Sequence, residues 1–151
     1  MGSITRDNFN ALVEAGDFDA ILRLFDDDPS AVRRLLTRLT YSPDAAHHAN
    51  AIQAFKMLSS QRATQKPEFF REIIRRHIWG MNEEGGNIDW SAPEIIAAVI
   101  AGSPELFHSF IPIMYNTAIA EPLFHDSLHA ALQLIAEIHY NETDGHSEGR
   151  S

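Results

Sequence analysis

The sequence predicts a single all-α domain of seven or eight helices, stacked as antiparallel pairs in a short superhelix. Apolar residues recur at helical spacing along most of the chain, and no window alternates apolar and polar residues as a half-buried strand would. Polar caps, glycines and prolines divide this pattern into helices of about 10–18 residues. Short connections between such helices are typical of antiparallel pairs in bundles and α-solenoids.

The first part of the chain predicts three short helices. Thr5 is expected to cap the first helix, and Gly16 to end it. Asp17 then opens a second helix, which ends at residues 26–29 because three acids oppose the helix dipole there and a proline follows. That proline suits the first turn of a third helix, which ends near Tyr41.

The middle of the chain predicts two longer helices. An alanine-rich helix runs from about Pro43 to Ser60, and its small side chains allow a neighbouring helix to approach closely. The next helix begins at Pro67 and places apolar residues on one side as far as Met81. Its arginines are expected to point outward: Arg71, Arg75 and Arg76.

The last part predicts three more helices. Residues 91–94 read as a capping box, in which Ser91 caps a helix that ends at Gly102 and Glu94 reaches back to it. The following helix contains Pro112, which predicts a kink or break. A final helix is expected from residue 122 or 124 to 140. The domain therefore covers residues 1–140, and the polar, glycine-containing segment 141–151 is predicted to be a disordered tail.

Composition limits the compartment and the chemistry. The chain has no cysteine, which excludes disulfides, thiolate metal ligands and cysteine catalysis. Its N-terminus has no basic segment followed by an apolar run, and its longest apolar stretch, Ile95 to Ala101, is too short to span a bilayer. We therefore expect a cytoplasmic protein that does not associate with membranes.

The net charge of −9 is distributed unevenly along the chain. The stretch from His77 to Gly149 contains no lysine or arginine, although it contains eleven acids. Such a surface repels phosphate backbones, so nucleic-acid binding is disfavoured and a basic partner or a cation is favoured. The alternative is an acidic surface that only keeps the protein soluble.

The segment from Trp79 to Trp90 is the strongest candidate for a functional surface. It contains both tryptophans of the chain, two adjacent glycines and several side-chain oxygens, so it could bind a cation or present Trp90 to a partner. It does not have the ligand spacing of an EF-hand. The alternative is a structural loop with both tryptophans in the core. The predicted contact residues are Asn82, Glu83, Glu84, Gly85, Gly86, Asp89, Trp90 and Glu94.

The stretch from about Phe69 to Glu94 resembles a segment of uncharacterised bacterial HEAT-like repeat proteins, some of which are grouped with phycobilisome-lyase repeats. In that group an apolar helix leads into a loop similar to Asn-Asp-Glu-x-Gly-Gly-x-x-Trp, followed by an Ala-Pro-Glu helix start. The matching residues here are Asn82, Glu84, Gly85, Gly86, Trp90, Ala92, Pro93 and Glu94. The resemblance covers about a sixth of the chain, and it implies a HEAT-like superhelix and a binding scaffold rather than a particular reaction.

Enzyme chemistry has weaker signals. His125 and His129 are four residues apart and share a helix face, so they could ligate one metal ion, but both also fit an ordinary helix surface. The adjacent His47 and His48 cannot converge on one face. No phosphate-binding loop, nucleophile elbow or dinucleotide fingerprint occurs. The alternative to a scaffold is a metal-binding or lyase-like enzyme, or a protein that handles a cofactor.

The sequence favours an interaction scaffold over an enzyme, and no cofactor is expected. In this hypothesis Trp90 is an aromatic anchor, and the acids Glu83, Glu84 and Asp89 beside it select a basic protein partner. The ends of a helical stack expose apolar faces unless they are capped, so a homodimer is an alternative partner.

Overall fold

The computed structural model describes residues 5–83 and 88–150, with side chains described as far as Ile138. Every regular element in these ranges is helical, which confirms the all-α prediction. The elements are α1 (Arg6–Ala15), α2 (Phe18–Asp27), α3 (Pro29–Leu39), α4 (Ala45–Arg62), α5 (Pro67–Asn82), α6 (Ala92–Gly102), α7 (Pro104–Phe107), η1 (His108–Phe110), α8 (Ile111–Ile119), η2 (Pro122–Phe124) and α9 (His125–Arg150).

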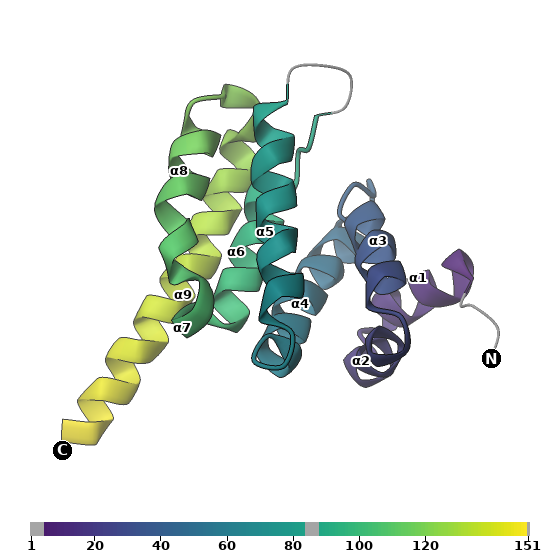
Figure 1. Ribbon diagram of the computed structural model, residues 1–151, viewed down its shortest axis with the longest axis horizontal. Helices are drawn as coiled ribbons and strands as arrows, with labels where there is room; N and C mark the ends of the chain where they lie inside the picture. The colour runs from purple at the N-terminus through teal and green to yellow at the C-terminus, as the bar shows by residue number, and fades with distance from the viewer. Residues whose placement is uncertain (1–4, 84–87, 151) are drawn as a thin grey trace.

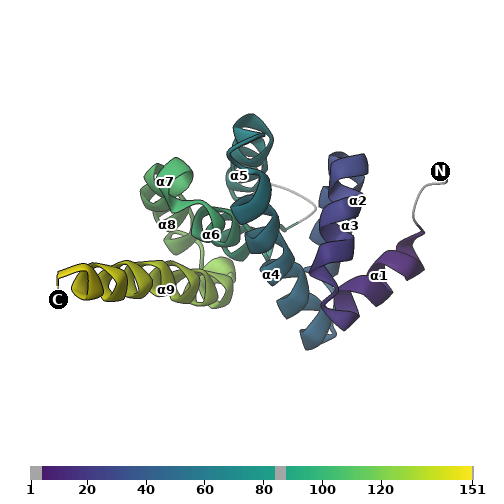
Figure 2. The ribbon, with the colours of Figure 1, turned by 90° about the horizontal axis from the view of Figure 1, so that it is seen from below.

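The helices form two groups that α4 connects (Figures 1 and 2). In one group, α5, α6, α8 and α9 run alternately up and down, so consecutive helices are antiparallel (Figure 1). In the other group, α1, α2 and α3 lie at the opposite end of the molecule. Helix α4 contacts α1, α2, α3 and α6, whereas α6 contacts α4, α5, α7, α8 and α9.

The helix boundaries near the N-terminus follow the predicted local chemistry. The side chain of Thr5 accepts a hydrogen bond from the backbone N–H of Asn8, and Asp17 caps α2 in the same way. Gly16 ends α1 with a φ of 67°, a left-handed conformation that glycine adopts without steric cost. Asp28 ends α2 and caps α3, whose first residue is the predicted proline.

The break predicted at Pro112 is confirmed. The chain forms the single turn α7 and the 3₁₀ turn η1, and a new helix then begins at Ile111. Pro112 lies in the first turn of α8. The backbone N–H groups of a first turn have no partner within the helix, so the missing N–H of proline costs no hydrogen bond there.

The capping box predicted for residues 91–94 is wrong in its chemistry. Ser91 occupies the N-cap position of α6, but its side chain makes no capping hydrogen bond. Its hydroxyl instead donates to the carbonyl oxygen of Thr40, 3.0 Å away, and Glu94 bonds to His48. Tertiary partners have therefore replaced the local capping pair.

Helix α9 continues to Arg150, past the start of the segment 141–151 that the sequence predicts to be a disordered tail. Each glycine inside a helix costs only about 1 kcal/mol relative to alanine, so Gly145 and Gly149 weaken this helix without forbidding it. No side chain from His139 onward is described, and the tail stays a prediction.

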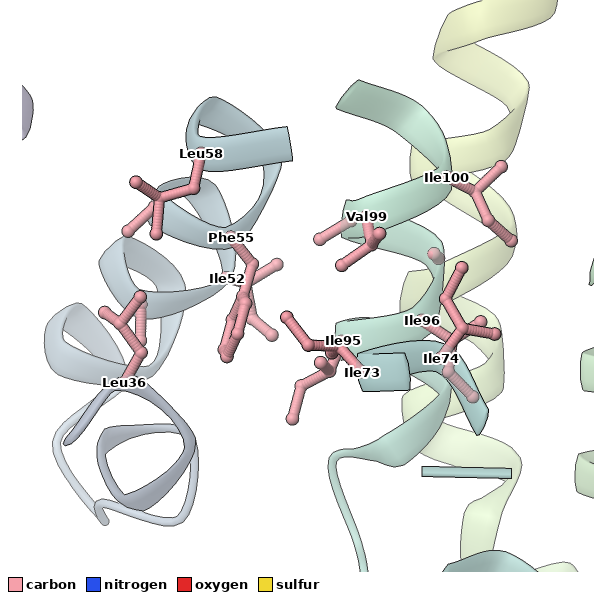
Figure 3. Close-up of a cluster of buried hydrophobic side chains, with 14 of the residues drawn as sticks. Leu36, Ile52, Phe55, Leu58, Ile73, Ile74, Ile95, Ile96, Val99 and Ile100 are labelled. Atoms are coloured by element: carbon pink, nitrogen blue, oxygen red, sulfur yellow. The ribbon is translucent and has the colours of Figure 1, made fainter. Parts of the chain in front are cut away.

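Helix α6 is buried on all sides. The side chains from Ile95 to Ile100 are all fully buried. Figure 3 shows Ile52 and Phe55 of α4 turned toward Ile95 and Val99, with Ile96 and Ile100 on the other side of the helix. A helix that is apolar all round needs neighbours on every face, and α6 is therefore the centre of the core.

Small side chains let α4 and α6 approach closely. The hydroxyl of Ser59 donates to the carbonyl oxygen of Val99 at 2.7 Å, and the hydroxyl of Ser103 donates to the carbonyl oxygen of Ser59 at 2.9 Å. A Cβ atom placed on Gly102 would lie 2.3 Å from the backbone oxygen of Lys56. Both serines are buried, so water does not compete for these hydrogen bonds. The two bonds therefore fix how α4 and α6 are positioned along each other.

Among the described helices, none alone has the length and apolar content needed to cross a membrane. Helix α6 together with Pro104–Ile119 reaches that composition, but the two parts bend by 118° at their junction. A buried core helix passes such a composition test as readily as a membrane span.

We predict that Gly102→Ala destabilises the fold by about 1–3 kcal/mol, because the added methyl group forces α4 and α6 apart. Helix propensity alone would act in the opposite direction, by up to about 1 kcal/mol. Urea denaturation followed by circular dichroism measures the difference in unfolding free energy. An unchanged or higher midpoint would mean that the two helices can separate without cost.

Candidate functional site

A groove of about 820 Å³ opens between α3 and α5, beside the segment that leads into α6. Figure 1 shows α3 and α5 on either side of α4. We call this feature the α3–α5 groove, and it is lined by Thr37, Tyr41, Arg76, His77, Trp79, Gly80, Glu83, Ile88, Asp89 and Trp90.

Helical spacing brings the lining residues to one place. Thr37 lies in the last turn of α3, and Tyr41 follows one turn later, just after the helix ends. On α5, Arg76 and Gly80 are four residues apart and therefore share a face, and Glu83 follows at the C-cap of the helix. The connection to α6 supplies the remaining wall through residues 88–90.

Asp89 is the central polar residue of the groove. The hydroxyl of Tyr41 donates a hydrogen bond to its Oδ1 atom. The Nδ1 atom of His77 lies 2.7 Å from its Oδ2 atom. A Cβ atom on Gly80 would lie 2.6 Å from that same Oδ2, so only glycine allows the carboxylate this approach. Both oxygens of Asp89 are thus used inside the protein, and they fix the wall of the groove.

Tyr41 and His77 each support Asp89 differently. Burial raises the pKa of the Tyr41 phenol, and the hydrogen bond to Asp89 raises that pKa further, so the hydroxyl stays protonated and donates. The His77 side chain is buried, and its Nε2 atom has no hydrogen-bond partner among the described residues. The His77–Asp89 pair therefore has no described nucleophile to activate, in contrast to a hydrolytic triad.

The aromatic residues of the groove face solvent. Trp79 is 71% exposed and Trp90 is 46% exposed, and Ile88 between them is 41% exposed. The alternative in which both tryptophans pack in the core is therefore wrong. Large apolar side chains exposed next to one another typically mark a contact surface.

The charges of the groove differ between its two ends. Arg76 lies at one end, close to Arg33 of α3. Burial lowers the pKa of Arg33, and the positive charges of Arg76 and Arg34 lower that pKa further. Glu83 lies seven residues along α5, at the exposed end beside the connection. The groove is therefore basic at one end and acidic at the other.

A second polar network fixes the start of α6. The Nε2 atom of His48 lies 2.7 Å from a carboxylate oxygen of Glu94, and its Nδ1 atom lies 2.7 Å from the carbonyl oxygen of Thr40. The hydroxyl of Ser127 accepts a hydrogen bond from the backbone N–H of Glu94. The pKa of His48 is raised, mainly because of its hydrogen bond to Glu94.

The structure divides the predicted contact residues into three sets. Glu83, Asp89 and Trp90 line the groove. Asn82 and Glu94 lie outside its lining, because Asn82 donates to the carbonyl of Ile78 at the end of α5 and Glu94 bonds to His48. Three predicted residues lie outside the described part of the chain: Glu84, Gly85 and Gly86.

Sequence reasoning missed Tyr41 and His77. His77 occupies the core-facing side of α5, at apolar spacing from Ile73, Ile74 and Met81. A histidine in an otherwise apolar stripe was the available signal, since a buried polar group requires a partner. The residue that would provide that partner, Asp89, lies in a segment whose course local patterns do not define.

The predicted histidine pair gains no further ligand from the fold. The Nε2 atom of His125 lies 3.0 Å from the carbonyl oxygen of Ile119, and that of His129 lies 3.5 Å from the Nε2 atom of Gln133. Within residues 5–83 and 88–138, no three histidine, aspartate or glutamate side chains come together in a metal-binding group. The geometry gives the metal-site alternative no support.

Comparison with protein-family models finds no match to this chain, and comparisons with curated proteins and with solved structures find none either. The arrangement of the residues themselves is therefore the basis for a functional proposal.

We predict that Glu94→Gln makes stability less dependent on pH. Because Glu94 raises the pKa of His48, this pair stabilises the fold fully below the unfolded histidine pKa, and the stabilisation is lost as the pH rises through the folded pKa. The free-energy difference between wild type and variant should therefore be larger at about pH 5.5 than at about pH 8.5.

Chemical denaturation at the two pH values tests this prediction, with the exposed Glu105→Gln as the control variant. The control should show no such pH dependence. Equal differences for Glu94→Gln at both pH values would show that His48 does not gain charge-dependent stabilisation from Glu94.

Proposed function

We propose that this chain is a HEAT-like protein-interaction module that binds a basic protein partner through the α3–α5 groove. The observation that supports this most is the exposure of both tryptophans, Trp79 at 71% and Trp90 at 46%, in a groove whose wall is fixed by internal hydrogen bonds. Tryptophan is among the residues that contribute most to binding at protein interfaces.

The fixed wall favours binding because less conformational freedom is lost when a partner docks. Asp89 bonds to Tyr41 and His77, and the adjacent Ser91 bonds to Thr40, so both sides of Trp90 are held in place. A surface ordered before binding gains affinity, since the cost of ordering it was met on folding.

The charge of the chain supports a basic partner. Glu83 is exposed at the rim of the groove, and the sequence from His77 to Gly149 carries no lysine or arginine. A free carboxylate beside exposed indoles attracts the cationic side chains of a basic partner. The stacked helices also fit the HEAT-like resemblance, since helical repeats commonly bind partners along surfaces between their helices.

Affinity capture from the native host tests the proposal. We expect the Trp79→Ala/Trp90→Ala double variant to lose about ten-fold or more of a captured basic partner, because both aromatic anchors are removed. Quantitative mass spectrometry of the captured proteins provides the measurement.

The control is Leu123→Ala on η2, because Leu123 is 47% exposed, like Trp90, but lies outside the groove. It should retain the partner. If the tryptophan variant keeps the same circular dichroism spectrum and captures the same proteins as wild type and control, the groove is not the contact surface.

A further inference from the structure

The α3–α5 groove carries one basic and one acidic side chain at a defined separation. Arg76 and Glu83 are seven residues apart along α5, which corresponds to about 10 Å along the helix. The other arginines of this helix are paired, since Arg71 and Arg75 bond to Glu68. Neither Arg76 nor Glu83 forms an ion pair with any described residue, and both side chains line the groove.

The aromatic residues lie between these charges along the chain. Trp79 follows Arg76 by one turn of α5 and precedes Glu83 by another. At the Glu83 end, Trp90 adds a second exposed indole. An exposed indole beside a carboxylate is a favourable site for an ammonium or guanidinium group, because the ring face and the carboxylate both attract the cation.

The other end favours an anion. Arg76 lies near enough to Arg33 for the two charges to interact, and neither arginine forms an ion pair with a described residue. A planar guanidinium binds a carboxylate through two parallel hydrogen bonds. Asp89 does not disturb this division, because both of its oxygens already accept hydrogen bonds from the protein.

We infer that the groove binds an extended peptide segment in which a basic and an acidic residue are three positions apart. The inference rests on the proposed function and specifies the partner's sequence chemistry. In the extended polyproline II conformation a chain rises about 3.1 Å per residue with three residues per turn. Residues three positions apart therefore lie on the same face and span about 9 Å, close to the roughly 10 Å between Arg76 and Glu83. The basic residue contacts Glu83 and the tryptophans, the acidic residue contacts Arg76, and an apolar residue between them packs on Trp79.

The size of the groove favours an extended segment over a helix. Its volume of about 820 Å³ is in the range of clefts that hold compact ligands, about 300–1,000 Å³. A helix with its side chains is about 10–12 Å across, so it would have to lie largely outside such a space.

Intrinsic fluorescence provides a direct measurement of binding. The chain has only two tryptophans, and both line the groove. The probes are blocked hexapeptides with leucine between a lysine and a glutamate three positions apart, made in both orders, together with versions in which either charge is replaced by glutamine. We expect one order to shift the emission and to bind about ten-fold more tightly than either glutamine version.

Two variants assign the charges to their places. Glu83→Gln should remove the preference for lysine while the preference for glutamate remains, and Arg76→Gln should do the reverse. The matched control is Glu72→Gln/Arg75→Gln, an exposed pair on the same helix that lies outside the groove. It should bind all the peptides as wild type does.

Two results would overturn the inference: no peptide binds, or all versions bind equally. If the peptides fail while the tryptophan variant still loses its captured partner, the groove is a contact surface with a different specificity. If that variant also captures the same proteins as wild type, the proposed function fails as well. Circular dichroism of each variant confirms that it is folded.

Discussion

The close approach of α4 and α6 determines where the other helices lie. Gly102 leaves no Cβ atom in the space occupied by the backbone of Lys56, and Ser59 and Ser103 exchange hydrogen bonds with the opposite helix. Helix α3 packs on α4, whereas α5 packs on α6. The distance between α3 and α5 therefore depends on a contact that neither of those helices makes. It also depends on α2, which packs on α3 and contacts α5 through the rings of Phe25 and Phe69, 5.4 Å apart.

The connection between α5 and α6 is fixed at two points on either side of Trp90. Asp89 bonds to Tyr41 and His77, while Glu94 bonds to His48. Tyr41 follows α3 and His48 belongs to α4, so one attachment reaches the N-terminal group of helices and the other reaches the helix that connects the two groups. The same bonds that join the two helix groups also order the wall of the groove, which couples the stability of the fold to the shape of the site.

The sequence predicted the parts of the structure that depend on neighbouring residues. The caps at Thr5 and Asp17 and the break at Pro112 each involve atoms within four residues, so a local pattern suffices. The Tyr41–Asp89 hydrogen bond joins residues 48 positions apart, and the sequence carries no mark of it. Pairings at such separations depend on how the helices stack, as the failed capping box at Ser91 also illustrates.

The tryptophans show why composition alone could not define the site. An indole suits a core and an interface equally well, so Trp79 and Trp90 were compatible with either until their exposure was known. The acids of the segment were equally ambiguous, because Asp89 and Glu94 serve internal histidines and only Glu83 of the described acids remains available in the groove. In the proposed binding mode, selectivity would depend on the spacing of Arg76 and the C-cap residue Glu83 and less on the net charge of −9. In the proposed complex, net charge would attract a basic partner, and two opposite charges about 10 Å apart would select the segment of it that fits.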